Sequence, residues 1–262
     1  MASNDTIKKT LVVTLVLCIV CSVIVSTASV KLKPLQEINK ELDFNLKLLQ
    51  AAGIYDENLT VPEQFSQIET KLIDLRTGKF SSDMDITTYN QRKASKDSSL
   101  SDSLDSNVDI AGIKRLEYYS LVYLVNNSDG LSKVILPIRG YGLWSTLYGF
   151  LALENDLNTI VGIGYYEHGE TPGLGGEVDN ESWKAKWQGS NGKTKKIYGP
   201  NGDVKFAVLK GAVIEGSANE EYQVDGLSGA SLTTKGVDNM IKFWLGKEGF
   251  GLFLTKLGKG EA

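Results

Sequence analysis

The sequence has few of the residues on which many functional sites depend. Of its 262 residues only two are cysteine and one is histidine. Both cysteines, Cys18 and Cys21, lie in an apolar run near the N-terminus, so the rest of the chain has no disulfide and no structural zinc site built on cysteine. Thiols at this spacing can form a redox pair or bind a cluster. In an apolar helix they usually serve as small apolar side chains, and we expect no metal site.

The chain also has no excess of positive charge. Its formal net charge is −4 at pH 7, and one short lysine group, Lys193, Lys195 and Lys196, is the nearest approach to a basic stripe. Binding to the phosphates of a nucleic acid requires a basic surface, so a nucleic-acid partner is excluded. We interpret the lysine group as a solvent-exposed loop. The apolar content of 42% is ample for a hydrophobic core.

One long apolar segment is present near the N-terminus. Residues 10–30 contain no charged side chain, and two lysines flank each end: Lys8, Lys9, Lys31 and Lys33. A helix of this length reaches about 31 Å at about 1.5 Å per residue, enough to cross a bilayer core. We predict an uncleaved membrane anchor in residues 1–33. A cleaved signal peptide is the alternative, because residues 26–28 offer a small-x-small cleavage site. The evenly divided lysines do not orient the span.

Residues 34–115 are predicted to form a helical and polar connecting region. Between residues 35 and 49 apolar side chains recur every three or four positions, and the pattern stops near Gly53. This spacing predicts an amphipathic helix. Residues 81–110 are rich in serine and aspartate, which indicates a polar surface segment with one helix at about 90–96.

Residues 116–262 are predicted to form an α+β domain. Four segments rich in β-branched and aromatic residues predict consecutive hairpins of an antiparallel sheet: 118–125, 131–138, 143–153 and 159–166. Segments 203–209 and 212–215 are expected to add strands, and a helix from about 234 to 246 is expected to pack on the sheet. The predicted fold class is therefore α+β, with a single N-terminal transmembrane helix before the sheet and its helices.

A loop of small residues, 225–234, leads into the last of these helices. Thr233 or Thr234 is a natural N-cap, and the loop's glycines permit a tight turn. Free N–H groups and the positive end of the helix dipole would face the side chain of Ser231, which favours an anion such as phosphate. Most Ser/Gly-rich helix entries are only caps, so the residues alone favour a cap and allow a phosphate site.

A second glycine-rich segment, 165–178, follows the last predicted strand of the sheet. It holds four glycines in the eight residues after His168, so its backbone can lie flat against a ligand. It matches neither a P-loop nor a dinucleotide-binding motif. Glu170, Thr171 and Leu174 occur together with upstream aromatic residues such as Trp144, a combination that suits a planar heteroaromatic ring with polar edges. A long surface turn is the alternative.

His168 also permits a hydrolase hypothesis, with Ser228 as the nucleophile. Ala230 stands where the nucleophile-elbow motif requires glycine, and the histidine precedes the serine, unlike the order in α/β-hydrolases. Triads do occur in other orders. A serine hydrolase is therefore a less favoured alternative, and we assign no catalytic residue.

Three motifs together resemble the FMN-binding domain family. They are Asp-Gly-Leu-Ser-Gly-Ala-Ser-Leu-Thr at 225–233, Glu-Thr-Pro-Gly-Leu-Gly-Gly at 170–176 and Gly-Leu-Trp-Ser at 142–145. Within that family the chain is most similar to the C subunits of bacterial sodium-translocating NADH:quinone oxidoreductases, and more loosely to the G subunit of the Rnf complex. The match extends over nearly the whole chain. The resemblance implies an electron-transfer subunit that relays electrons from NADH toward ubiquinone in an enzyme that exports sodium.

The resemblance also implies the cofactor and its attachment. In this family FMN is bound through its phosphate to the last hydroxyl of a Ser/Thr-Gly-Ala-Thr motif, which here is Ser231 in place of the usual threonine. A separate FMN transferase, which uses FAD and magnesium, forms the ester, with Asp225 among its determinants. The resemblance further implies the bacterial inner membrane with the globular domain on the periplasmic side, and as partners the other membrane subunits and membrane lipid.

We therefore predict one set of cofactor-binding residues. Ser231 carries the phosphoester, and Thr233 is a second candidate hydroxyl. The other members are Ser228 and Thr234 near the phosphate, Trp144, Glu170, Thr171, Leu174 and Gly175 along the flavin, and Gly229, Ala230 and Asp225 in the motif itself. The alternative function is an anchored periplasmic domain that binds flavin non-covalently or acts as a scaffold.

Overall fold

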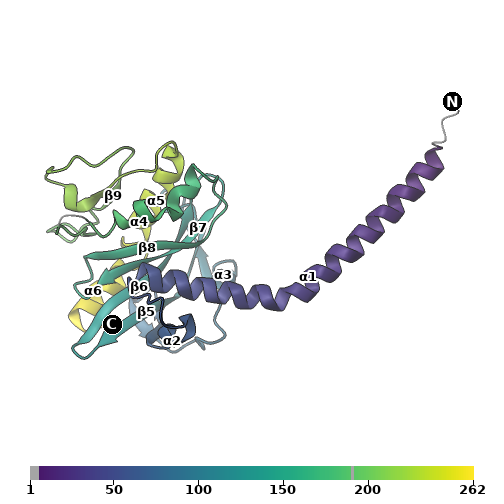
Figure 1. The fold of residues 1–262 in the computed structure, drawn as a ribbon. Coiled ribbons are helices and arrows are strands. Elements are labelled where there is room, and N and C mark those ends of the chain that lie inside the picture. The colour runs from purple at the N-terminus through teal and green to yellow at the C-terminus, as the bar shows by residue number, and fades with distance from the viewer. Residues whose placement is uncertain (1–5, 190–191) are drawn as a thin grey trace. The chain divides into compact units, whose positions relative to one another are not determined.

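The computed structural model describes residues 6–189 and 192–262 (Figure 1). The chain divides into two compact units, of which the first ends at Phe44 and the second is Asn45–Ala262. Helix α1, Ile7–Ala51, contributes to both. Each unit is described separately.

The first unit consists of the N-terminal part of α1. The helix continues through Pro34, and its apolar side chains up to Leu42 are exposed. By length and composition α1 is able to cross a membrane, and the predicted span at 10–30 lies within it. The amphipathic helix predicted at 35–49 is not a separate element, because it belongs to the same continuous helix. It ends at Ala51, close to Gly53, which has a positive φ of 64°.

The second unit is built around a six-stranded sheet with the order β2-β1-β5-β6-β7-β8. Every neighbouring pair of strands in it is antiparallel. Four of the strands are those predicted from the sequence: β5 (Tyr119–Asn127), β6 (Gly130–Tyr141), β7 (Thr146–Glu154) and β8 (Ile160–Glu167). The predicted α+β class with an antiparallel sheet is confirmed.

The predicted connecting region contributes the other two strands of this sheet. They are β1 (Ile68–Asp74) and β2 (Lys79–Ser81), and β1 pairs with β5 along its whole length. The expected boundary between residues 115 and 116 therefore does not separate two units. A further strand pair, β3 (Ser101–Ser103) with β4 (Arg115–Glu117), lies outside the main sheet.

Helices cover both faces of the sheet. On one face α5 (Ser231–Trp244) and α6 (Gly251–Lys259) pack over the main apolar core, which includes Leu136 of β6 and Leu151 of β7. The last turns of α1 lie on the other face, where a Cβ at Gly162 of β8 would stand 2.6 Å from the carbonyl oxygen of Ala51. Two short helices, α2 (Val61–Phe65) and α3 (Gln91–Ala94), come before strands β5 to β8 in the sequence. The helix predicted at 90–96 is thus confirmed as α3.

The segment between β8 and α5 differs from its prediction. It contains the 3-10 turns η1 (Gly175–Asp179) and η2 (Glu220–Tyr222), helix α4 (Glu181–Ala185) and two short strands, β9 (Ala207–Val208) and β10 (Gln223–Val224). These two strands pair in parallel. The strand predicted at 212–215 does not form, because the N–H of Val213 donates to the carboxylate of Asp225 instead of a strand partner.

Candidate functional site

Three segments that are distant in the sequence meet at one place in the second unit. They are the turn 142–145 between β6 and β7, the loop 168–176 after β8, and the start of α5 with the loop before it. The two glycine-rich stretches and the Gly-Leu-Trp-Ser motif of the sequence are therefore brought together. One buried carboxylate, that of Glu170, contacts the other two segments.

Glu170 is only 5% exposed and accepts hydrogen bonds on both carboxylate oxygens. Its Oε1 accepts from three successive backbone N–H groups, those of Leu143 at 3.0 Å, Trp144 at 2.9 Å and Ser145 at 3.1 Å. Its Oε2 accepts from the Thr233 hydroxyl at 2.7 Å. The carboxylate thus ties the β6–β7 turn to the first turn of α5.

Two glycines make room for this carboxylate. A Cβ at Gly142 would lie 2.6 Å from Oε1 of Glu170. A Cβ at Gly175 would lie 2.5 Å from Oε2 and equally close to the Thr233 hydroxyl oxygen. Real Cβ atoms do not approach other atoms this closely, so a side chain at either glycine would displace Glu170.

The ionised form of Glu170 is stabilised by neutral donors. Burial alone raises the pKa of a carboxyl group, but the Thr233 hydroxyl and the three N–H groups lower it, and the net pKa of Glu170 lies below the usual 4.5. No lysine or arginine in the described part of the chain forms an ion pair with it. Glu170 is therefore a buried negative charge at neutral pH that is solvated by the protein backbone.

Helix α5 presents its N-terminus to solvent beside this cluster. Ala230 is the N-cap and Ser231 is the first helical residue, with an exposed side chain. The N–H of Thr234 donates to the carbonyl of Ala230 at 2.9 Å. Within residues 6–189 and 192–262 the three preceding N–H groups, of residues 231–233, have no acceptor. This arrangement can bind an anion.

The predicted N-cap and helix start are wrong by three residues. Thr233 and Thr234 are 1% and 2% exposed and lie inside the first turn of the helix. Their hydroxyls serve tertiary contacts, since Thr233 donates to Glu170 and Thr234 accepts from the N–H of Leu227 at 3.0 Å. Threonine hydroxyls engaged in this way cannot cap the helix.

Large apolar side chains are exposed around the start of α5. Trp144 is 68% exposed, Leu174 46% and Leu232 62%. Leu174 lies against Gly229, where a Cβ would stand 3.2 Å from its Cδ2, and Gly229 has a positive φ of 73°. Large apolar groups that remain exposed beside a set of free donors are typical of a binding surface.

The other predicted residues of the two loops have mainly backbone roles. The carbonyl of Thr171 accepts from the N–H groups of Leu174 at 3.1 Å and Gly176 at 2.9 Å, which closes the turn that presents Leu174. Ser228 is exposed and Ala230 is buried.

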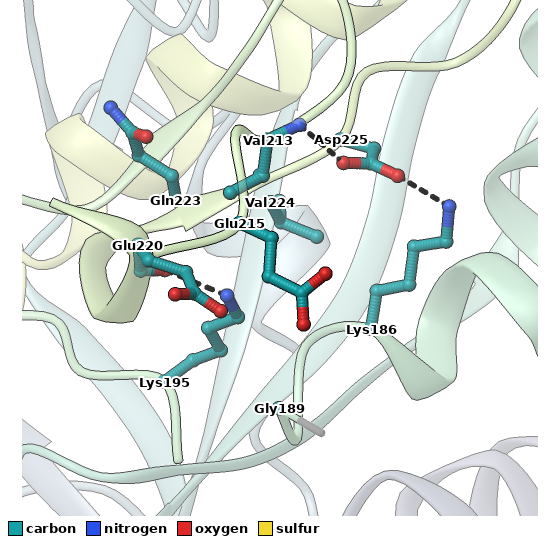
Figure 2. Close-up of a pocket in the computed structure, with 9 residues that line it drawn as sticks. All are labelled: Lys186, Gly189, Lys195, Val213, Glu215, Glu220, Gln223, Val224 and Asp225. Carbon is teal, nitrogen blue, oxygen red and sulfur yellow. Dashed lines mark hydrogen bonds and ion pairs between the residues drawn. The ribbon is translucent and has the colours of Figure 1, made fainter. Parts of the chain in front are cut away.

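Asp225 is the predicted site residue that lies apart from the Glu170 cluster. Its Oδ1 accepts from the N–H of Val213 at 2.7 Å, and its Oδ2 forms an ion pair with Lys186 (Figure 2). Asp225, Lys186, Lys195 and Glu220 line a cavity of about 300 Å³, and Figure 2 shows their side chains around it. The Nζ of Lys195 donates to the backbone carbonyl of Glu220 at 2.7 Å. Burial lowers the pKa of Lys195. The lysine loop, which we predicted to be exposed to solvent, is therefore held at this cavity by the hydrogen bond of Lys195.

The hydrolase hypothesis requires His168 to contact Ser228, but the hydrogen-bond partners of His168 are other residues. Its Nε2 lies 2.8 Å from Oδ2 of Asp179, and its Nδ1 accepts from the N–H of Glu170 at 3.2 Å. The hydrogen bond to Asp179 raises the pKa of His168 above 6.5. Both ring nitrogens are therefore engaged, and neither contacts Ser228.

Two features of this surface do not follow from the sequence pattern. Leu232 lies outside the predicted helix, which starts at about residue 234, but belongs to the first turn of α5. The hydrogen bond between Thr233 and Glu170 joins residues 63 positions apart, which no local pattern can indicate.

Comparison with known proteins assigns the family. The FMN-binding domain model matches residues 142–246, which contain all three segments of the site. The chain is 51% identical, over 100% of both chains, to the C subunit of the Na(+)-translocating NADH-quinone reductase of Pseudomonas aeruginosa. It is 50% identical to the C subunit of the reductase of the same name from Vibrio vulnificus, over 99% of each chain.

Solved structures agree with this assignment. The crystal structure of Shewanella oneidensis NqrC matches with a TM-score of 0.75 and 35% identity, covering 85% of this chain and 99% of that one. The C subunit from Parabacteroides distasonis matches with a TM-score of 0.64 and 26% identity, covering 86% of this chain and 97% of that one. The chain therefore belongs to the family of the C subunits of Na(+)-translocating NADH-quinone reductases and contains that family's FMN-binding domain.

Proposed function

We propose that this chain is the electron-transfer subunit of a sodium-translocating NADH:quinone reductase and that it carries FMN as a phosphoester on Ser231. The observation that carries the proposal is the exposed hydroxyl of Ser231 at the first residue of α5, inside the segment matched by the FMN-binding domain. The N–H groups of residues 231–233 can bind phosphate oxygens there, and the helix dipole favours the negative charge.

Ser231 suits an ester better than the neighbouring hydroxyls do. Thr233 and Thr234 are almost fully buried, and each hydroxyl already forms a hydrogen bond that holds the fold. Ser228 is exposed but lies before the N-cap, outside the helix. An ester at Ser231 breaks no buried hydrogen bond, which supports it over Thr233 as the attachment site.

The exposed apolar side chains fit a planar ring system. We propose that Trp144 and Leu174 line the isoalloxazine ring, with Leu232 beside Ser231, because these groups are exposed around the helix start. The turn closed by Thr171 and the backbone at Gly175 hold Leu174 in this position. When bound, FMN supplies the electron-transfer chemistry. The chain holds and orients the ring, and we assign it no acid or base.

Formation of the ester requires a second protein. The Ser231 hydroxyl forms no hydrogen bond to a histidine or carboxylate in the described residues, so no base activates it as a nucleophile. We propose that an FMN transferase attaches the cofactor and recognises the loop that begins at Asp225. The ion pair with Lys186 holds Asp225 in one position at the edge of this loop.

We further propose a location in the bacterial inner membrane, with the second unit on the periplasmic side. Helix α1 serves as the single anchor, and Cys18 and Cys21 are exposed on it as small side chains that face lipid or another subunit. The partners are the other membrane subunits of the complex and membrane lipid.

Attachment is tested by producing the full chain together with an FMN transferase. Denaturing gel electrophoresis under ultraviolet light should show a fluorescent band for the parent chain and for Ser231→Thr, and none for Ser231→Ala. Thr255→Val is a matched control, because the Thr255 hydroxyl bonds within α6 to the carbonyl of Gly251.

A different outcome would favour the alternative function. Flavin that copurifies with the chain but leaves on denaturation would show non-covalent binding. A fluorescent band that persists in Ser231→Ala would move the ester to another hydroxyl. Either result would overturn the proposed attachment.

A further inference from the structure

Glu170 joins the two parts of the proposed FMN site. Its carboxylate contacts the Trp144 backbone 26 residues away in the sequence and the Thr233 hydroxyl 63 residues away. Trp144 is one of the side chains proposed to line the ring, and Thr233 lies two residues after the proposed attachment serine. The carboxylate is therefore one of the contacts that set the separation between ring surface and attachment point, beside the close packing of α5 on the end of β6, where a Cβ at Gly236 would clash with the carbonyl oxygen of Tyr141.

We propose that Glu170 is the positioning residue of the site, which helps to fix the turn 142–145 relative to the start of α5 and places a buried negative charge without a lysine or arginine partner beneath the flavin surface. The inference rests on the proposed function. Glu170 itself is 5% exposed, so it acts on the cofactor through this turn and through its charge.

The donor set matches the two oxygens of a carboxylate at this position. Oε1 accepts from three N–H groups and Oε2 from a hydroxyl, so both oxygens act only as acceptors. A glutamine could still accept from the three N–H groups and donate to Thr233, which conserves the shape and removes the charge. An alanine would remove both and leave the three N–H groups, the Thr233 hydroxyl and the more distant Ser145 hydroxyl, at 3.5 Å from Oε1, without this acceptor. The two substitutions therefore separate charge from position.

The charge has a predictable effect on the bound cofactor. Reduction of a flavin adds electrons to the ring, and a nearby buried negative charge opposes this. No lysine or arginine in the described ranges pairs with Glu170. A nearby titratable group is His168, which pairs with Asp179 and whose pKa is raised mainly by that hydrogen bond and also by the charge of Glu170. Glu170→Gln should therefore shift the flavin midpoint potential to a more positive value. A purely structural role would not produce a shift of fixed sign.

Thr233 tests the positioning role without changing the charge. Thr233→Val removes the donor to Oε2 and retains a β-branched side chain of similar volume, while Thr233→Ser retains the hydroxyl. Thr255→Val is the matched control for loss of a threonine hydroxyl in a helix. Ser231 is unchanged in each of these variants, and the flavin-labelled fraction is measured for each of them before the visible circular dichroism is compared.

The experiment uses the full chain, produced with an FMN transferase and purified in detergent, with three measurements. These are the flavin-labelled fraction from in-gel fluorescence, the visible circular dichroism of the flavin, and its midpoint potential. We expect Glu170→Ala to lower the labelled fraction several-fold. Thr233→Val should change the visible circular dichroism, and Thr233→Ser should restore it. Glu170→Gln should raise the midpoint potential.

The inference is overturned if Glu170→Gln leaves the midpoint potential unchanged, or if Thr233→Val matches the parent and Thr255→Val in visible circular dichroism. Glu170→Gln and Thr233→Val therefore test the inference even if Glu170→Ala does not fold. Failure of the proposed function is distinct, because it appears as a parent chain without covalent flavin or as a labelled Ser231→Ala.

Discussion

Two buried glutamates of the second unit are stabilised in opposite ways. The side chain of Glu117, at the end of β4, is fully buried and forms a bidentate pair with Arg139 of β6, with both contacts at 2.7 Å. Gln91 donates a further hydrogen bond to it at 2.6 Å. Glu170 is also buried, but only neutral N–H and O–H groups contact its carboxylate.

The difference distinguishes a carboxylate that holds the fold from one that serves a site. At Glu117 a cation of opposite charge compensates the cost of burial, and the pair links β4 to β6. At Glu170 the charge stays uncompensated, and its donors belong to segments that carry the proposed ring surface and attachment point. Buried charge without a counter-charge is costly and clusters at functional sites.

Loss of Arg139 should have the largest effect on stability. Arg139→Met leaves the Glu117 carboxylate buried without its cation, which should cost about 3–5 kcal/mol of unfolding free energy. Urea unfolding of the purified chain measures this. The folded fraction should still receive FMN, because the pair lies outside the proposed site. An unchanged urea midpoint would contradict the structural role of the pair.

A side chain at Gly175 should have the next largest effect. The new Cβ of Gly175→Ala would stand 2.5 Å from both the Glu170 and the Thr233 oxygen atoms and would separate them. We expect a loss of about 1–3 kcal/mol, together with a lower flavin-labelled fraction. Gly211→Ala is the control, because nothing lies within 4 Å of its Cβ position. Equal behaviour of the two variants would show that the contact is not required.

The smallest of these effects is expected in the pH dependence of stability, compared between the parent chain and Glu170→Gln. The pKa of Glu170 is lowered in the folded chain, so its contribution to stability is present above pH 4.5 and is lost as the pH falls through the folded-state pKa. Glu170→Gln cannot titrate. Urea midpoints measured from about pH 7 down to about pH 3 should therefore converge for the parent and the variant at the acid end. Parallel curves would contradict the lowered pKa.

Local patterns predicted the elements that are rich in apolar, β-branched and aromatic residues. The hairpins of β5 to β8 contain long apolar and aromatic segments, and they form as expected. Strand β1 was missed because Glu69, Thr70 and Lys71 occupy its first half, and only its last residues are consistently buried. Its strand character comes from pairing with β5, which is a tertiary property.

The site was predictable in composition but not in geometry. The glycine and hydroxyl content of the two loops allowed a ligand surface, and the resemblance to the FMN-binding domain family turned it into a prediction. The start of α5 could not be located, because Thr233 and Thr234 direct their hydroxyls to Glu170 and Leu227. Asp225 belongs to the same motif as Ser231 but pairs with Lys186 at a separate cavity, which only the fold reveals.

The most direct test of the central claim is peptide mass spectrometry of the parent chain produced with an FMN transferase. The peptide that contains Ser231 should carry the mass of FMN as a phosphoester, and fragmentation should place it on Ser231. An unmodified peptide, or a modification located on Thr233 or Ser228, would contradict the account.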